Sequence, residues 1–65
     1  MSVDNLMQME EVATELRIPI ATLRYWRTRA EGPKSFRLGR RVVYLRKDVE
    51  AWIQRAYESD SRSVL

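Results

Sequence analysis

Two short helical patterns in the first half of the chain are joined by only three residues, Arg17-Ile18-Pro19. Proline lacks an amide donor and restricts the residue before it, but it is tolerated where a helix begins. We therefore expect one helix to end at about Leu16 and a second to run from about Ile20 to Ala30. So short a junction favours two helices packed at an angle. The apolar residues of both patterns keep helical spacing and should face the core: Met9, Val12, Ala13 and Leu16 in the first, Leu23, Trp26 and Ala30 in the second.

A breaker, Glu31-Gly32-Pro33, ends the second helix, and a β-rich region follows it. Phe36 and Leu38 flank a polar residue, and the run from Arg41 to Leu45 is rich in β-branched and aromatic side chains. The pattern predicts a two-stranded hairpin whose tip is Gly39-Arg40-Arg41. An isolated hairpin is barely stable in water, so we expect one of its faces to pack on the helices.

A third helix should begin near Asp48, because an acidic residue favours a helix start. Apolar side chains then recur at helical spacing, and we expect this helix to close the core. From Glu58 onward the sequence is polar and loses the period, which predicts a frayed tail. We expect one domain over residues 1–57 and a flexible polar tail over residues 58–65. The expected fold is mainly α with a small β-hairpin, in the order α-α-β-β-α of winged helix-turn-helix folds. The apolar residues of the third helix are Val49, Trp52, Ile53, Ala56 and Tyr57.

The absence of cysteine and histidine excludes several kinds of chemistry. The chain can form no disulfide, no thiol nucleophile, no imidazole base and no zinc site of the Cys/His type. Tyr25, Tyr44 and Tyr57 have no companion acid or base for attack on a phosphodiester. We therefore expect no enzyme activity, no catalytic residue, no metal and no cofactor. Trp26 and Trp52 lie on apolar stripes, so we expect both in the core rather than stacked on bases.

Positive charge is concentrated in the middle of the chain. Residues 1–16 carry four acids and no cation, and residues 48–65 carry four acids and two cations, which gives −4 and −2. Residues 17–47 carry ten cations against Glu31 alone, a local charge of +9. Eight of those ten are arginine, whose planar guanidinium group suits phosphates and guanine edges. A solvated basic surface is the alternative, but the density of this block favours binding to nucleic acid.

The expected contact residues lie on the outer face of the second helix and at the hairpin tip. In a helix-turn-helix that binds DNA, the second helix enters the major groove of the duplex, which is wide enough to admit a helix. A thin arginine-tipped loop can enter the minor groove. Taken singly, each residue is open to being an ordinary exposed side chain, and the Arg-Arg pair to keeping a hairpin soluble. We expect Thr22, Arg24, Tyr25 and Thr28 in the major groove, with Arg24 first, Arg27, Arg29, Lys34 and Arg37 on the phosphate backbone, and Arg40 and Arg41 in the minor groove.

Two stretches, MEEVATELRIPIATLRYW and LGRRVVYLRKDVEAWI, resemble the excisionase and MerR-like group of winged-helix DNA-binding domains. The resemblance spans Leu6 to about Ile53. It implies a recognition helix at Ile20 to Ala30 in the major groove and the Gly39 hairpin as a wing in the minor groove. Two positions depart from the pattern: Arg17 stands where glycine is favoured, and Pro19 where a capping serine is favoured. The most specific matches are Glu11-Val12-Ala13 with Leu16, Thr22-Leu23-Arg24 with Trp26, Gly39-Arg40-Arg41, and Asp48-Val49-Glu50-Ala51-Trp52.

Within this group, small free-standing proteins are typically phage excisionases, also called recombination directionality factors, or AlpA-like transcriptional regulators. The resemblance therefore implies a protein that binds adjacent DNA sites cooperatively, bends the DNA and directs an integrase toward excision. The implied partners are double-stranded DNA and a phage integrase. The acidic first helix, or the acidic C-terminal part, could contact the basic middle of a neighbour, so charge polarity predicts head-to-tail association with further copies of the chain. Ligand-responsive activation is not expected, because the chain lacks the effector domain of full MerR-like regulators.

Two other functions remain open from the residues alone. The basic region would also suit a protein-interaction module that binds an acidic partner. Single-stranded RNA binding would require exposed aromatic side chains, for which only Tyr25 and Tyr44 offer themselves. No apolar run approaches the roughly 20 residues that cross a bilayer, and acids stand where a signal peptide would be basic. We therefore expect a cytoplasmic, nucleoid-associated protein with no membrane partner.

Overall fold

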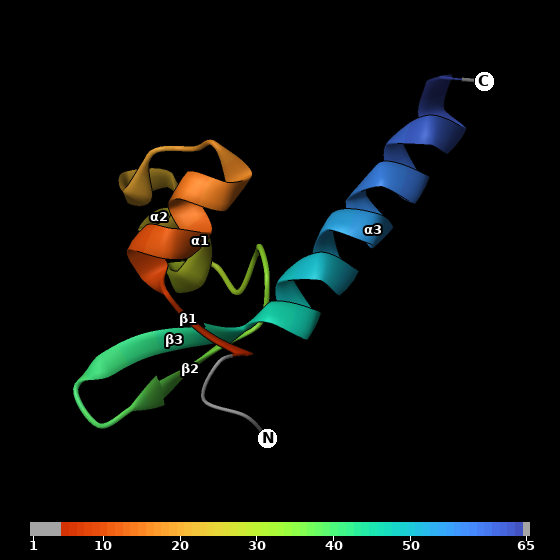
Figure 1. The fold of residues 1–65 in the computed structure, drawn as a ribbon. Helices are drawn as coiled ribbons and strands as arrows, with labels where there is room; N and C mark the ends of the chain where they lie inside the picture. Colours follow the sequence, from red (N-terminus) through yellow and green to blue (C-terminus); the bar gives the residue numbers. More distant parts are fainter. Residues whose placement is uncertain (1–4, 65) are drawn as a thin grey trace.

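The computed structural model describes residues 5–64, and the side chains of residues 5–60. Three helices and a small antiparallel sheet follow one another along these residues (Figure 1). The fold is therefore the expected small winged helix-turn-helix arrangement, with one strand added at its start. The elements are β1 (Leu6–Gln8), α1 (Met9–Leu16), α2 (Ile20–Thr28), β2 (Ser35–Leu38), β3 (Arg41–Leu45) and α3 (Arg46–Val64).

The sheet contains the predicted hairpin and a strand that the sequence did not reveal. Its order is β1-β3-β2, and both pairings are antiparallel. The β2–β3 hairpin closes with Leu38 opposite Arg41, so Gly39 and Arg40 form the turn and Arg41 is the first residue of β3. Gly39 has a φ of 65°, a conformation that glycine adopts without strain. β1 covers the other edge of β3, and its Met7 is among the most buried side chains.

The turn between α1 and α2 is built without glycine. Arg17 has a φ of 58°, the left-handed conformation that usually ends a helix at a glycine. Around it the amide of Ile18 donates to the Ala13 carbonyl at 3.0 Å, and the amide of Arg17 donates to the Thr14 carbonyl at 3.1 Å. Pro19 caps α2 with a φ of −63°, and its carbonyl accepts the amide of Thr22 at 3.0 Å. Arg17 therefore keeps the geometry of the favoured glycine but carries the strain of a side chain.

α2 ends at Thr28 and not at Ala30 as predicted. Ala30 has a φ of 56°, and the amide of Glu31 donates to the Trp26 carbonyl at 2.8 Å, which repeats the bonding that closes α1. Helical spacing alone could not place this end, because alanine is a strong helix former. After it, Gly32 turns back against the ring of Trp26.

The core lies where the helix pair packs on the sheet. Tyr44, Met7, Leu23 and Val12 are its largest fully buried side chains. Ala13 and Val49 complete the cluster, and half-buried apolar residues of α1, α2 and β3 pack around it. Since Tyr44 is 1% exposed, it is not available as a stacking platform for single-stranded nucleic acid.

α3 departs most from the sequence prediction. It begins at Arg46, directly after β3, and runs on to Val64, so the expected frayed tail from Glu58 is helical in the structure. A hydrogen bond from Gln54 to Glu58, 3.1 Å long and four residues apart, supports this part of the helix. Within residues 5–64, no helix, α3 included, has an apolar stretch able to cross a membrane.

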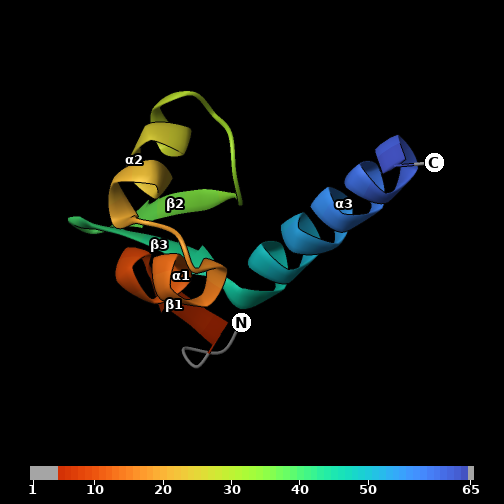
Figure 2. The same ribbon diagram turned by 90° about the horizontal axis from the view of Figure 1, so that it is seen from above.

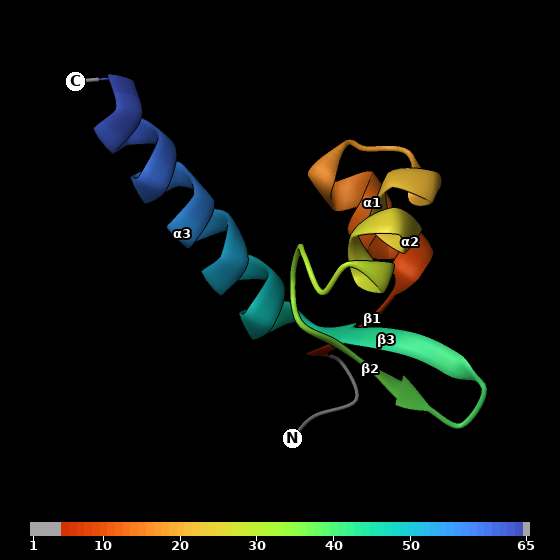
Figure 3. The ribbon, with the colours of Figure 1, turned by 180° about the vertical axis from the view of Figure 1, so that it is seen from behind.

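Among the described residues, α3 packs on the rest of the protein mainly through its first turns. Figures 1, 2 and 3 show its second half projecting away from the helix pair and the sheet. Val49 is buried, and the ring of Trp52 lies 5.4 Å from that of Trp26. Ile53 and Tyr57, expected in the core, are 41% and 68% exposed. The third helix therefore closes the core only as far as Trp52, and both tryptophans lie half-buried at its edge.

Candidate nucleic-acid interface

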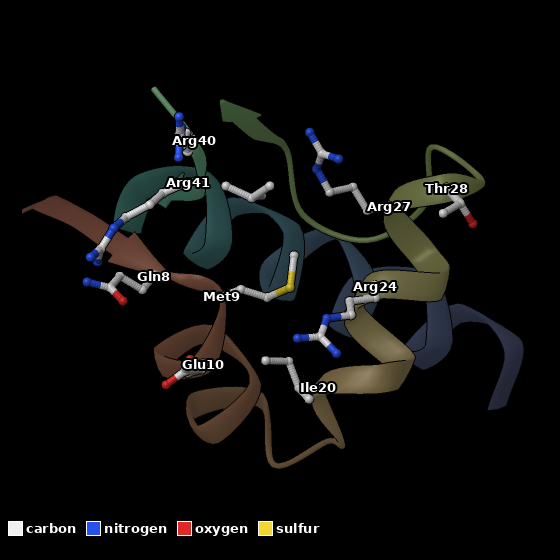
Figure 4. A pocket seen from close by; sticks show the side chains of 10 residues that line it. Gln8, Met9, Glu10, Ile20, Arg24, Arg27, Thr28, Arg40 and Arg41 are labelled. Atoms are coloured by element: carbon white, nitrogen blue, oxygen red, sulfur yellow. The ribbon is translucent and has the colours of Figure 1, made fainter. Parts of the chain in front are cut away.

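A cleft of about 650 Å³ lies between α2 and the β2–β3 hairpin. We call it the α2–hairpin cleft (Figure 4). One wall comes from α2, the other from the hairpin turn and the start of β3, and one end from the first residues of α1. Its lining residues are Gln8, Met9, Glu10, Ile20, Arg24, Arg27, Thr28, Arg40, Arg41 and Val42.

Four arginines from the two walls meet at this cleft. Arg24 and Arg27 come from successive turns of α2, and Arg40 and Arg41 come from the hairpin (Figure 4). All four are exposed. The sequence separates the two pairs by more than ten residues, and the fold joins them because the hairpin packs on the helix pair. The spatial proximity predicted for the second helix and the hairpin tip is therefore present in the structure.

The charge of this cleft is largely uncompensated within the chain. In the described part of the chain, the side chains of Arg24, Arg40 and Arg41 form no ion pair or hydrogen bond. Arg27 donates from Nε to the Ser35 hydroxyl at 3.2 Å, which fixes its direction without neutralising it. Glu10 is the one acid on the lining. Like charges gathered in this way repel each other, so a polyanion bound in the cleft would relieve the repulsion.

Apolar side chains lie between the arginines. Met9, Ile20 and Val42 are half-buried, and they pack against the core beneath the cleft. In Figure 4 Met9 lies between Arg41 on one side and Arg24 on the other. The cleft thus has an apolar floor and cationic walls, an arrangement that suits a chain of sugars and phosphates.

Tyr25 and Arg29 form a separate cluster outside the cleft. Tyr25 is 56% exposed, and its hydroxyl accepts a hydrogen bond from Nη1 of Arg29 at 3.1 Å. The Arg29 guanidinium also lies 5.5 Å from the centre of the Tyr25 ring and forms an ion pair with Glu31 at 3.4 Å. Neither Tyr25 nor Arg29 lines the α2–hairpin cleft. The ion pair with Glu31 partly neutralises Arg29, unlike the arginines of the cleft.

A comparison with known protein families matches residues 6–57 to a family described as a helix-turn-helix domain. This match covers most of the chain. The protein belongs to this helix-turn-helix family. No curated protein and no solved structure matches the chain significantly. Membership supports DNA binding, and helix-turn-helix domains are typically not enzymes. Among residues 5–64, no three acidic, histidine or cysteine side chains converge on a position that could hold a metal ion.

Only some of the contact residues predicted from the sequence of the helix-turn-helix domain line the cleft. Thr28 shares the cleft with Arg24, as their spacing predicted, and its hydroxyl donates to the Tyr25 carbonyl at 2.7 Å. Thr22 is half-buried and does not line the cleft. Lys34, in the loop, and Arg37, on β2, are exposed. The structure therefore brings together Arg24, Arg27, Thr28, Arg40 and Arg41, and leaves Thr22, Tyr25, Arg29, Lys34 and Arg37 outside the cleft.

Sequence reasoning missed the contribution of the chain's start to this site. Gln8, Met9 and Glu10 line the cleft because β1 pairs with β3 and brings the beginning of α1 beside the hairpin. A strand of three residues is too short for alternation to be visible in a sequence, so no local pattern signals it. Gln8 is also the N-cap of α1, and its amide donates to the Glu11 carboxylate at 3.0 Å.

Tyr44 lies in the core beneath Arg27 and is no candidate nucleophile for the helix-turn-helix domain. It stands opposite Ser35 in the sheet, where Ser35 also accepts the bond from Arg27. Burial raises the pKa of the Tyr44 phenol above its ordinary value of 10.0, although the hydrogen bond with Ser35 and the charge of Arg27 act in the opposite direction. A buried phenol with a raised pKa is poorly suited to attack a phosphodiester.

Proposed function

We propose that this protein binds duplex DNA sequence-specifically, with α2 in the major groove and the β2–β3 hairpin in the adjacent minor groove. One observation carries the proposal: arginines of both elements line a single cleft, and those of the hairpin have no partner in the described part of the chain. The sugar-phosphate backbone that separates the two grooves would lie in this cleft, above Met9 and Val42. Arginine suits this task because its guanidinium binds phosphate in a bidentate manner.

The proposed roles of the residues follow their places on α2 and the hairpin. Exposure and position favour Arg24 and Thr28 for base contact over Thr22, which is half-buried, and Tyr25, which is engaged by Arg29. The side chains proposed to hold phosphates are Arg27, Arg29, Lys34 and Arg37, and those proposed to enter the minor groove are Arg40 and Arg41.

DNA binding is tested by measuring the affinity of the protein for a duplex at several salt concentrations. A binding constant that falls steeply with salt is expected, because each neutralised phosphate releases condensed counterions. The opposing hypothesis is a protein-interaction module that uses the same basic region for an acidic partner. Weak duplex binding with a shallow salt dependence would support that hypothesis and contradict ours.

Within DNA binding, we propose the role of a phage excisionase that binds adjacent sites cooperatively, bends the DNA and directs an integrase toward excision. Cooperative binding needs a contact between copies. Glu10, Glu11 and Glu15 gather on the outer face of α1, whereas the middle of the chain is basic beyond the cleft as well, so opposite charges favour a head-to-tail contact. Duplexes with one and with two adjacent sites test this contact, because sites filled independently would rule cooperativity out.

The alternative role is a small AlpA-like transcriptional regulator, which would use the same DNA surface. A DNase I footprint together with a circular-permutation assay separates the two roles. Protection over several adjacent sites and a strong bend are expected of an excisionase. A short footprint on nearly straight DNA would instead assign the chain to the regulators.

A further inference from the structure

A second basic hollow, of about 540 Å³, lies beyond the end of α2. Its lining residues come from the loop that follows α2, the start of β2 and α3. Figure 3 shows this loop beside the start of α3. We call it the loop–α3 hollow. Its charged and polar lining residues are Arg27, Glu31, Lys34, Ser35 and Arg55.

The hollow is held in place by the packing of two tryptophans. Trp26 of α2 and Trp52 of α3 lie 5.4 Å apart, which anchors α3 beside the end of α2. Arg55 follows Trp52 by less than one helical turn. The packing of the two tryptophans therefore determines that Arg55 lies on the side of α3 that lines the hollow. The loop itself is shaped by Gly32, whose φ of 77° turns the chain tightly against Trp26, and by the buried Pro33.

Three cations face this hollow with little compensation. In the part of the chain that the structure describes, the side chains of Lys34 and Arg55 form no ion pair or hydrogen bond. Glu31 is the one acid on the lining, and it is engaged by Nε of Arg29 at 3.4 Å. The Ser35 hydroxyl accepts from Arg27 and is also hydrogen-bonded to Tyr44, so it is engaged within the protein. The lining thus offers cationic donors, and a matching ligand is an anion with several oxygen acceptors.

The position of Arg27 indicates the source of that anion. Arg27 lines both the α2–hairpin cleft and the loop–α3 hollow, so the two basic surfaces are continuous around the end of α2. We propose that the loop–α3 hollow binds a backbone phosphate of the same duplex, and that Arg55 of α3 is a DNA-contacting residue. This inference rests on the proposed duplex binding and extends it, because α3 becomes a third element on the DNA beside α2 and the hairpin.

The test compares Arg55→Ala with Lys47→Ala in the full chain. Both substitutions remove one positive charge from α3, but Lys47 lines a different hollow, with Arg46 and Glu50. Fluorescence anisotropy would measure the affinity for a labelled duplex carrying the target site, and for one of unrelated sequence, at several salt concentrations. Because both side chains are exposed, thermal unfolding should be little changed in either variant.

We expect Arg55→Ala to lower the slope of log K against log salt by about 0.9, the loss of one phosphate contact, and to weaken both duplexes by the same factor. Lys47→Ala should leave the slope unchanged, and Arg55→Lys should restore most of it. Equal slopes for Arg55→Ala and Lys47→Ala would overturn the loop–α3 hollow as a phosphate site and leave the proposed function intact. Failure of the unsubstituted protein to bind either duplex would overturn the proposed function itself.

Discussion

Arg24 and Arg40 lie on opposite walls of one cleft, yet we expect them to contribute to binding in different ways. Arg24 comes from the exposed side of α2, where a guanidinium can pair with a guanine edge. Arg40 comes from the hairpin turn, where the minor groove offers negative potential but little sequence information. Specificity and general affinity should therefore be separable by single substitutions.

We predict that Arg24→Ala removes about 1–3 kcal/mol of discrimination at one base pair, because the bidentate contact to guanine is lost. Competition between the target duplex and single base-pair variants measures this loss. Arg40→Ala is the matched comparison, and it should weaken all duplexes alike and flatten the salt dependence. If both substitutions affected every duplex equally, the two walls would not have separate roles.

Tyr44 should make folding sensitive to alkaline pH. Its folded-state pKa is raised above the ordinary 10.0, mainly by burial, so its contribution to stability is complete below that pH and is lost as the pH rises through the folded pKa. We predict that the free energy of unfolding declines above about pH 10. Denaturant titration at several pH values measures the decline, which Tyr44→Phe should reduce and Tyr57→Phe, at an exposed site, should not. An equal decline in both variants would contradict this assignment.

For single residues, the sequence predicted the candidate site only in part. The helical spacing of Arg24 and Thr28 correctly placed them on one face, and the fold put that face beside the hairpin. Spacing could not show that Thr22 is half-buried or that Arg29 forms an ion pair with Glu31 beyond the end of α2. Those outcomes depend on contacts with residues outside the helix, which a periodicity does not contain.

The two helices of the helix-turn-helix both end at a residue other than glycine in the left-handed conformation, Arg17 after α1 and Ala30 after α2. Such a residue costs roughly 1–2 kcal/mol, and glycine relieves that cost but loses more entropy on folding. We predict that Arg17→Gly raises stability by about 0.5–1 kcal/mol. Chemical denaturation would measure the gain. Arg17→Ala removes the same charge but keeps the side-chain strain, so an equal gain there would attribute the effect to charge.

The two glycines should respond differently to a methyl group. At Gly32 a Cβ would lie 2.8 Å from the ring of Trp26, whereas at Gly39 nothing lies within 4 Å. Both have a positive φ, so both alanine variants carry strain of roughly 1–2 kcal/mol. We predict that Gly32→Ala destabilises the protein more than Gly39→Ala, because Trp26 or the loop must also shift. Thermal unfolding of the two variants checks the order, and an equal loss would contradict the close packing at Gly32.

Of the elements, the two helices and the hairpin follow from local patterns, and the discrepancies have physical causes. β1 is stabilised by pairing with β3, which no local pattern records. The second half of α3 has polar residues that form a helix without burying a face. Its apolar residues Ile53 and Tyr57 keep the spacing of a core helix but project beyond the core, since only Val49 and Trp52 reach it.

For the whole molecule, the decisive arrangement is that of charge over the fold. The basic middle of the sequence becomes two continuous hollows around the end of α2, while the acids of the first helix lie on its outer face. The distribution of charge along the sequence predicted that positive charge would be concentrated. The fold shows which elements carry it, namely α2, the hairpin, the loop after α2 and α3. We propose that α2 and the hairpin straddle one sugar-phosphate backbone of the duplex.

Affinity cleavage tests where α2 and the hairpin lie on the duplex. The protein contains no cysteine, so a single introduced thiol can carry a DNA-cleaving reagent at a chosen position. The exposed positions Ala21 on α2 and Leu38 beside the hairpin turn are suitable, and Thr14 on the outer face of α1 is the control. We predict cleavage from the major groove for Ala21→Cys and from the minor groove for Leu38→Cys, within about half a helical turn, or about 5 base pairs, of each other. Thr14→Cys should not cleave. Cleavage from Thr14→Cys, or from only one of the other two positions, would show that α2 and the hairpin do not straddle one backbone.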